Sequence, residues 1–246
     1  MTKEEILKII EEKDIKLIRH VFVGLDGISR GRVGLAKNIL SSLENGAGIS
    51  ESVQAFNNLD HLIPDGRYSP VGEVWMIPDM ETFTVLPYTQ NSAVMLCDFQ
   101  TADKKPWEAC VRTFLKKIVK QVEAMGYSAQ CAIESEFYLF KMKDDEFKPY
   151  DETYYSSVAG MDATDKVISE IIACLETMGI SVEKYHPEYS PGQHEVVIHH
   201  SDPLKAADTH VIVKDAIKGV AINNGLVASF MPKPSTEKSG SGAHLH

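Results

Sequence analysis

The segment CAIESEFYLF, residues 131–140, constrains what this chain can fold into more than any other stretch of the sequence. Its apolar residues predict a buried strand, yet the strand carries two carboxylates, Glu134 and Glu136. Side chains two residues apart on a strand point to one face, so these carboxylates emerge together while Phe137 faces away. A solvated edge strand is the alternative, but the flanking residues are apolar and buried carboxylates are normally paired or bound to metal. We therefore expect a nearby cation, and oxygen ligands suit Mg²⁺ or Mn²⁺.

The amino-acid composition limits the classes of protein to which this chain can belong. The 246 residues are 43% hydrophobic and 24% charged, enough for a sizeable core and two domains. A formal charge of −10, without a cluster of Lys or Arg, makes nucleic acid an unexpected partner. The four cysteines are widely spaced, which indicates neither a disulfide framework nor a zinc knuckle and favours a reducing cytoplasm. The start resembles no signal peptide and no apolar run approaches ~18 residues, so no membrane association is expected.

The order of predicted elements indicates an α+β chain. Residues 2–13 predict an amphipathic helix capped by Thr2, and Asp26-Gly27 between two apolar runs predicts a hairpin. Residues 14 to about 100 predict a small mixed-sheet domain, followed by a linker over 101–107. Beyond it, helices predicted at 108–125, 162–178 and 202–223 alternate with strands, and 145–160 predicts a long loop.

Two further clusters carry groups that bind metal. Glu188 and Glu195 bracket Pro191-Gly192, which can turn the chain so that both carboxylates meet one cation, although a solvated loop explains them as well. His244 and His246 share one face of an extended segment that follows several glycines. A histidine pair at a chain end can also be a tag remnant or part of the surface, but this one ends a varied sequence.

Three segments, taken in order, resemble the glutamine synthetase family. They are the Glu-Ser-Glu-Phe-Tyr-Leu-Phe strand at 134–140, the acidic segment His-Pro-Glu through Pro-Gly-Gln-His-Glu at 186–195, and Phe-Met-Pro-Lys-Pro through Gly-Ser-Gly-Ala-His-Leu-His at 230–246. The resemblance implies an α+β fold. A β-grasp-like N-terminal domain, residues 1–102, would precede the N-terminal portion of the catalytic domain, residues 103–246. In the family that domain is an antiparallel sheet forming an open barrel flanked by helices.

The resemblance also implies roles for individual residues. By family position, Glu136, Glu188 and Glu195 would hold one Mg²⁺ or Mn²⁺, and Glu134 with His244 would hold a second. His246 would lie near the nucleotide phosphates. Ser239 and Gly240 would lie in the segment that contacts substrate glutamate.

The implied reaction is ATP-dependent ligation of an amine to the γ-carboxylate of L-glutamate through γ-glutamyl phosphate. Two cations would neutralise the phosphates and carboxylate that must meet, and no covalent enzyme intermediate is needed. With ammonia the product is glutamine, which places the protein in nitrogen metabolism as a glutamate–ammonia ligase. The resemblance further implies a cytoplasmic protein that forms a dodecamer of two six-membered rings when full length.

Departures from the family pattern leave alternatives open. The sequence stops directly after His246, so the arginines of the family's later half are not encoded, and we expect little or no synthetase activity from these 246 residues. An inactive fragment acting as a binding or structural protein is therefore one alternative. Ser239 replaces the usual Asn. In ammonia-using relatives a Phe-Asp-Gly-Ser-Ser motif supplies an aspartate to the active site. That aspartate is missing from the corresponding region of this chain, around Glu51 and ahead of Pro64-Asp65. The second alternative is therefore that the acceptor is an organic amine, such as a polyamine or ethanolamine.

Overall fold

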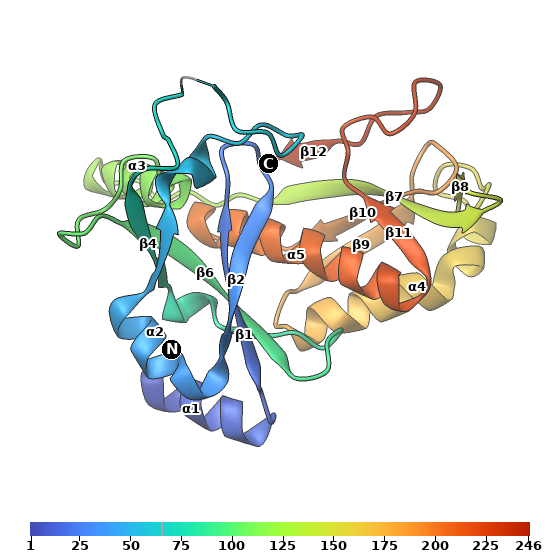
Figure 1. Ribbon diagram of the computed structural model, residues 1–246. Helices are drawn as coiled ribbons and strands as arrows, with labels where there is room; N and C mark the ends of the chain where they lie inside the picture. Colours follow the sequence, from blue (N-terminus) through green and yellow to red (C-terminus); the bar gives the residue numbers. More distant parts are fainter. Residues whose placement is uncertain (65) are drawn as a thin grey trace. The chain divides into compact units, whose positions relative to one another are not determined.

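The computed structural model describes residues 1–64 and 66–246, so Asp65 lies outside the described residues. The chain divides into two units (Figure 1). Unit 1 comprises residues 1–86 and 90–127, and unit 2 comprises residues 87–89 and 128–246. The domain limits 1–102 and 103–246 remain a prediction.

Unit 1 is built on a mixed sheet. Its strands follow the order β2-β1-β6-β4-β3, with β5 beside β6, and β1 runs parallel to β6 and antiparallel to β2. Its elements are α1 (Lys3–Glu12), β1 (Leu17–Val23), β2 (Ser29–Leu35), η1 (Ala36–Asn38), α2 (Ile39–Asn45), β3 (Ala47–Ser50), η2 (Glu51–Gln54), β4 (Glu73–Pro78), η3 (Met80–Thr82), β5 (Thr84–Val85), β6 (Ser92–Gln100) and α3 (Val111–Ala124).

Local chemistry explains the first elements of unit 1. The Thr2 side chain accepts a hydrogen bond from the Glu5 backbone N–H, while the Glu5 side chain accepts one from the Thr2 N–H, so α1 begins in a capping box. Gly27 adopts a φ of +77° in the turn between β1 and β2, and the Asp26 carboxylate accepts a hydrogen bond from the Ile28 N–H at 3.0 Å. The predicted N-terminal helix and hairpin are therefore confirmed.

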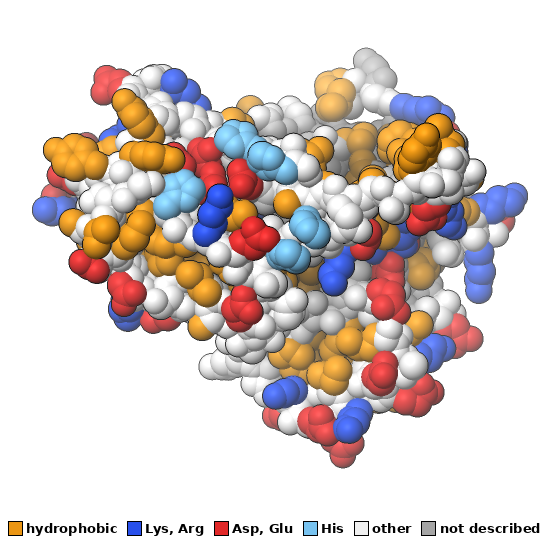
Figure 2. Space-filling model, turned by 180° about the vertical axis from the view of Figure 1, so that it is seen from behind, with side chains coloured by type: hydrophobic (Ala, Val, Ile, Leu, Met, Phe, Trp, Pro, Cys, Tyr) orange, Lys and Arg blue, Asp and Glu red, His pale blue; other side chains and the backbone are white. Residues whose placement is uncertain are grey.

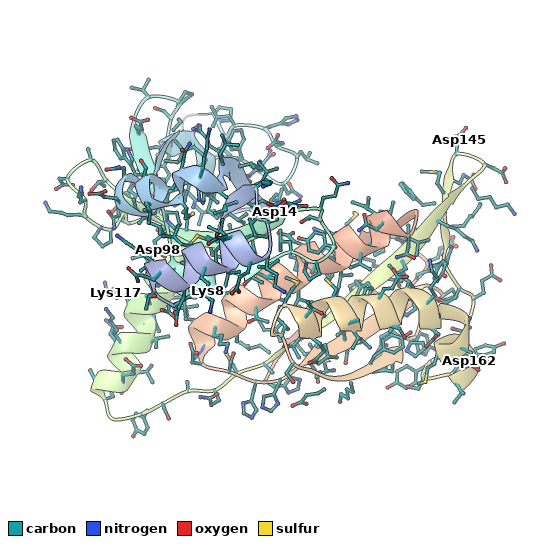
Figure 3. All side chains as sticks on the ribbon, turned by 90° about the horizontal axis from the view of Figure 1, so that it is seen from below. Lys8, Asp14, Asp98, Lys117, Asp145 and Asp162 are labelled. Carbon is teal, nitrogen blue, oxygen red and sulfur yellow. The ribbon has the colours of Figure 1, made fainter. Side chains whose placement is uncertain are left out.

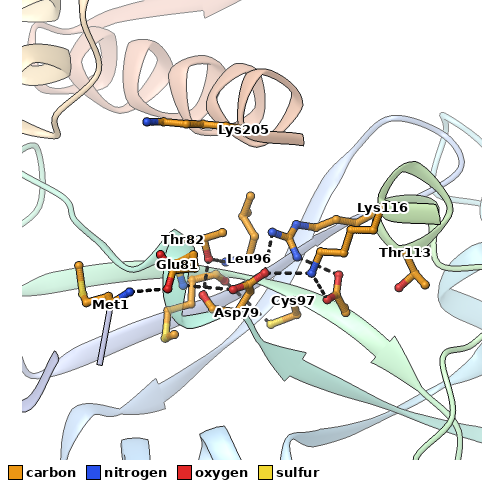
Figure 4. A network of polar contacts seen from close by, with 12 residues as sticks. Met1, Asp79, Glu81, Thr82, Leu96, Cys97, Thr113, Lys116 and Lys205 are labelled. Atoms are coloured by element: carbon orange, nitrogen blue, oxygen red, sulfur yellow. Dashed lines mark hydrogen bonds and ion pairs between the residues drawn. The ribbon is translucent and has the colours of Figure 1, made fainter. Parts of the chain in front are cut away.

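Helix α3 is attached to the sheet of unit 1 by a network of charged side chains (Figure 4). Arg112 and Lys116, one turn apart on the helix, lie between two carboxylates. Asp79, which caps η3, lies 2.9 Å from Arg112 Nη2 and 3.0 Å from Lys116 Nζ. Asp98 on β6 lies 2.8 Å from Arg112 and 2.5 Å from Lys116. Trp107, the last residue of the predicted linker, is buried in the core of the same unit.

Unit 2 is built on an antiparallel sheet with the strand order β11-β7-β10-β9, and with β8 and β12 also paired to β7. Its elements are β7 (Ile133–Lys143), β8 (Glu146–Pro149), α4 (Val158–Thr177), β9 (Val182–Pro187), β10 (Gln193–Ile198), α5 (Pro203–Asn223), β11 (Leu226–Ser229) and β12 (Ala243–Leu245). Helices α4 and α5 pack together against the sheet, where Phe137, Leu139 and Val196 are completely buried (Figure 1). The predicted α+β fold with an antiparallel second sheet is confirmed.

The long loop predicted over 145–160 is wrong. Strand β8 occupies Glu146–Pro149 and pairs with β7 through a turn in which Asp144 and Asp145 have φ values of 53° and 58°. Figure 3 shows Asp145 at the tip of this hairpin. Asp tolerates the left-handed conformation that such a turn requires, but an Asp-Asp pair is a weaker signal than Asn-Gly. Helix α4 then starts at Val158, earlier than predicted, because the Ser157 hydroxyl accepts a hydrogen bond from the Gly160 N–H.

The helices described in residues 1–64 and 66–246 include none that is long and apolar enough to cross a membrane.

Candidate metal centre

A row of carboxylate and imidazole side chains runs across the sheet of unit 2. The register places His244 of β12 opposite Glu134 of β7, and Glu136 of β7 opposite Glu195 of β10. Glu195 in turn lies opposite His186 of β9. Helices α4 and α5 pack on the other face, since Ser135 contacts His210 of α5 and His194 connects to Thr164 of α4 through Tyr185. The carboxylates therefore share the face that these two helices leave uncovered.

The ligand atoms of this row form three overlapping groups whose members lie within 4.8 Å of one another. The groups are Glu134, His244 and His246; Glu136, Glu195 and His244; and His186, Glu188 and Glu195. Figure 2 shows histidine and acidic side chains lying side by side on one face of the molecule. Carboxylate oxygens with imidazole nitrogens at these separations suit a divalent cation such as Mg²⁺ or Mn²⁺.

Glu134 and the two terminal histidines form one end of the row. Glu134 Oε2 lies 3.2 Å from His246 Nε2 and 3.9 Å from His244 Nδ1. The structure thus brings together the predicted pair Glu134 and His244. It also places His246, predicted beside the nucleotide, within reach of the same carboxylate.

Glu188 reaches the other end of the row through a turn. Gly192 in that turn adopts a φ of +76°, and a side chain there would press against the Leu139 carbonyl, so the position requires glycine. Glu188 Oε1 lies 2.8 Å from His186 Nε2, and the same imidazole nitrogen lies 4.0 Å from Glu195 Oε1. His186 stands in the acidic motif, but the sequence reasoning assigned it no role. The signal was its position two residues before Glu188, near the end of the predicted strand.

The charges in this row repel one another in the absence of a cation. Glu195 is only 5% exposed, and burial raises the pKa of its carboxyl. His186 opposes that rise, while the carboxylates of Glu134, Glu188 and Glu136 add to it. Like charges placed directly opposite on adjacent strands destabilise a sheet. The donor set therefore fits a bound cation better than an unliganded structural role.

The predicted substrate segment lies against the same strands. The Ser239 carbonyl accepts a hydrogen bond from the Tyr138 hydroxyl at 2.6 Å, and the Gly240 carbonyl accepts one from Gln193 Nε2 at 2.9 Å. Gln193 also donates to Glu136 Oε2 at 2.7 Å. The sequence reasoning assigned no role to Tyr138 or Gln193. Their strand spacing from Glu136 and Glu195 could have placed them on the same face.

A buried polar chain stabilises the opposite face of β10. His194 is fully buried, with its Nε2 atom 3.2 Å from Asp151 Oδ2 and its Nδ1 atom 3.0 Å from the Tyr185 hydroxyl. Tyr185 lies 2.9 Å from the Thr164 hydroxyl on α4, and burial raises the pKa of the Tyr185 phenol to about 12. The chain ties β9, β10 and α4 together, and so fixes β10, which carries Glu195, and β9, which Glu188 directly follows.

Protonation of His210 provides a test of the packing beneath β7. Burial, aided by the charge of Lys214, lowers the pKa of the His210 imidazole to about 4. In the unfolded chain the pKa of a histidine is about 6.5. Below pH 6.5 the unfolded chain binds the proton first, so stability is lost as the pH falls from 6.5 to 4. Because His210 is only partly buried, we expect a loss of about 1 kcal/mol between pH 7 and pH 5.

Urea denaturation followed by circular dichroism measures this loss, and His210→Gln should reduce it. His200→Gln changes an exposed histidine and should leave the pH dependence unchanged. An equal loss in parent and His210→Gln would contradict the assignment.

The antiparallel sheet of unit 2 is covered by helices on one face and carries carboxylates and imidazoles on the other. The family profile described as "Glutamine synthetase, catalytic domain" matches residues 108–246. A second profile, "Glutamine synthetase N-terminal domain", matches residues 1–107. The chain belongs to the glutamine synthetase family, as its sequence motifs indicate.

Relatives of similar sequence identity carry different enzyme names. A glutamate–isopropylamine ligase from Pseudomonas sp is 32% identical over 99% of this chain and 57% of its own length. Glutamine synthetases from Thermotoga maritima and Methanosarcina mazei are 32% and 33% identical over 100% and 99% of this chain, and 55% and 54% of their own lengths. The chain therefore spans about half the length of these curated relatives.

Solved structures agree with the fold. A structure described as GmaS without ligand is 26% identical, with a TM-score of 0.85 over 96% of this chain and 55% of that one. Another, described as a novel glutamine synthase homolog, is 24% identical with a TM-score of 0.87 over 94% of this chain and 55% of that one. The second likeness concerns the fold alone.

Proposed function

We propose that the protein containing this chain catalyses ATP-dependent ligation of an amine to the γ-carboxylate of L-glutamate. The observation that carries the proposal is the row of carboxylates and imidazoles across β12, β7, β10 and β9, in a chain of the glutamine synthetase family. The γ-phosphoryl group of ATP passes to the glutamate carboxylate and releases ADP. The amine nitrogen then attacks the acyl phosphate and releases inorganic phosphate.

The residues of this chain would act by holding and orienting charged groups. By family position, Glu136, Glu188 and Glu195 would hold one divalent cation, and Glu134 with His244 a second. The ligand atoms of Glu195 lie within 4.8 Å of those of Glu136 in one group and of Glu188 in another, and Glu134 groups with His244. Bound cations supply positive charge that lets phosphate and carboxylate oxygens approach each other. His246, next to Glu134, would face the nucleotide phosphates. Ser239 and Gly240 would contact glutamate, held in place by Tyr138 and Gln193.

The acceptor amine has two candidates. Ammonia is the first, because several relatives are named glutamine synthetases. An organic amine is the second, because one relative is named a glutamate–isopropylamine ligase and because the expected aspartate is missing, with Glu51 the nearest acidic residue. Glu51 starts η2, and a side chain added at Gly72 would press on its carboxylate. A carboxylate held there is positioned differently from a shorter aspartate, and an alkyl amine can gain affinity from apolar contacts instead.

Competition between acceptors tests this proposal. A protein that carries this chain at the full length of its relatives should release ADP only when ATP, glutamate and an amine are all present. Ammonium is compared with methylamine, isopropylamine, ethanolamine and a polyamine through kcat/KM. A higher value for ammonium than for every amine would exclude the second candidate, and amine-dependent turnover without glutamate would contradict the proposed reaction.

Assembly and location complete the proposal. We expect the full-length protein to form a cytoplasmic dodecamer, and light scattering of the active protein checks the assembly. A stable and active monomer would contradict it.

A further inference from the structure

Gln193 occupies a buried position between the metal centre and the segment 239–242. Its side chain is 2% exposed and extends from β10 on the same face as Glu195. Its Nε2 atom donates to Glu136 Oε2 at 2.7 Å and to the Gly240 carbonyl at 2.9 Å. One amide thus contacts both a candidate metal ligand and the backbone of the candidate substrate segment.

The surrounding donors determine which way this amide points. The Ser190 backbone N–H, which can only donate, lies 3.2 Å from Gln193 Oε1. The Tyr138 hydroxyl lies 3.3 Å from the same oxygen, but its one hydrogen is donated to the nearer Ser239 carbonyl at 2.6 Å. The Oε1 end therefore faces the Ser190 N–H, and both Nε2 hydrogens are directed to Glu136 and Gly240. A buried amide satisfied in this way has one orientation.

In the candidate metal centre, the hydrogen bond from Gln193 holds the Glu136 carboxylate in position. Glu136 belongs to the ligand group that includes Glu195 and His244, and its Oε2 atom accepts the hydrogen bond from Gln193. Outer partners that orient a ligand commonly contribute about 10–100-fold to metal affinity or activity. Without this bond, the Glu136 side chain would have to be ordered when the cation binds.

The consequence for the segment 239–242 is that it is anchored by side chains of β7 and the β9–β10 turn. Tyr138 donates to the Ser239 carbonyl, and the Ser190 hydroxyl accepts from the Ser239 N–H at 2.8 Å. The Glu136 N–H also donates to the Gly242 carbonyl at 3.1 Å. Residues 239–242 belong to neither a helix nor a strand, so these bonds set their position.

We propose that Gln193 is a positioning residue that couples cation binding at Glu136 to the ordering of the segment around Gly240. The proposal rests on the proposed function, because that function places a cation at Glu136 and glutamate at Gly240. In the metal-free chain the Gln193 amide already contacts both Glu136 and the Gly240 carbonyl. A bound cation would hold the Glu136 carboxylate more firmly against this amide, and the amide would pass that restraint to the Gly240 carbonyl. The segment around Gly240 is then more ordered when the metal centre is occupied.

Mutation of Gln193 tests the first half of this coupling. Gln193→Met keeps the side-chain length and removes both donors, while Gln193→Asn keeps an amide that is too short to reach both acceptors. We expect Mn²⁺ to bind each folded variant about 10–100-fold more weakly than the parent 246-residue chain, as measured by electron paramagnetic resonance.

Gln54→Met is the matched control. Gln54 is also buried and bonds the backbone through both ends of its amide, at Leu25 and Ala109, but it lies in unit 1. Parent-like Mn²⁺ affinity in a folded Gln193 variant would overturn the proposal.

Hydrogen exchange in the parent chain tests the second half without any mutation. Saturating Mn²⁺ should slow exchange of the Ser239 amide about tenfold or more, and should slow it less in Gln193→Met. If Mn²⁺ binds the parent but leaves Ser239 exchange unchanged, the coupling is absent. If Mn²⁺ does not bind the parent, the proposed function loses its metal centre and the coupling fails with it. Faster Ser239 exchange in metal-free Gln193→Met would then show only that the amide anchors the segment.

Discussion

Replacing Glu136 with alanine is expected to weaken Mn²⁺ binding to this chain by about 100-fold or more while leaving the fold intact. Loss of an outer partner of a ligand already costs about 10–100-fold, so loss of a ligand should cost at least as much. Glu136 lies opposite Glu195 in the sheet, and in the absence of a cation the two carboxylates repel each other. Relief of this repulsion offsets the loss of the hydrogen bond that buried Gln193 donates to Glu136, so the metal-free variant should stay folded, with a free energy of unfolding within about 1–3 kcal/mol of the metal-free parent.

Thermal or chemical denaturation with and without Mn²⁺ measures this difference. At a concentration of about 100 times the parent's Kd, Mn²⁺ should stabilise the parent by about 2.7 kcal/mol. A variant with about 100-fold weaker binding should gain only about 0.4 kcal/mol at the same concentration. Glu183→Ala is the control, because Glu183 is a half-exposed carboxylate on β9 of the same sheet, where it pairs with His199. Equal stabilisation of Glu136→Ala and parent would mean that Glu136 is not a ligand.

Replacing Arg112 with methionine is expected to destabilise unit 1 by about 2–3 kcal/mol. Arg112 is only 10% exposed and binds both Asp79 and Asp98, so its removal leaves two partly buried carboxylates that share the charge of Lys116. Breaking a fully buried ion pair costs about 3–5 kcal/mol, and the partial exposure of Asp79 and Asp98 reduces that figure.

Tryptophan fluorescence measures this effect in unit 1 alone, because both tryptophans of the chain, Trp75 and Trp107, belong to that unit. Lys120→Met replaces an exposed lysine of the same helix and should change stability by less than about 0.5 kcal/mol. An Arg112→Met transition that coincides with the parent's would contradict a stabilising role for the network.

The pH dependence gives a second measure of the same network. Burial disfavours ionised Asp79, but the hydrogen bond from Lys116 and the charge of Arg112 outweigh it and hold the pKa of Asp79 below its usual value. A lowered carboxyl pKa contributes stability above about pH 3.9, and that stability is lost as the pH falls through the folded-state pKa. The difference between parent and Arg112→Met should therefore shrink below about pH 4. A difference that is constant from pH 7 to pH 3 would contradict this explanation.

The sequence determined by itself the features that depend on neighbouring residues. The alternation of the 131–140 strand put Glu134 and Glu136 on one face because side chains on a strand alternate at every residue. Asp26-Gly27 produced its hairpin because glycine adopts positive φ without strain. The three ordered motifs were sufficient to indicate the glutamine synthetase family, since their residue types and spacing do not depend on how the strands pair.

Only the tertiary structure decided which distant residues meet. The cross-strand register places Glu195 between Glu136 and His186, and register depends on pairing between segments about 60 residues apart. The contacts of Gln193 with Glu136 and Gly240 have the same origin. Helix α3 follows a predicted linker, yet it belongs to unit 1 because Arg112 and Lys116 meet carboxylates on the loop after β4 and on β6. Such contacts form between surfaces that exist only after the chain has folded, so local residue patterns do not encode them.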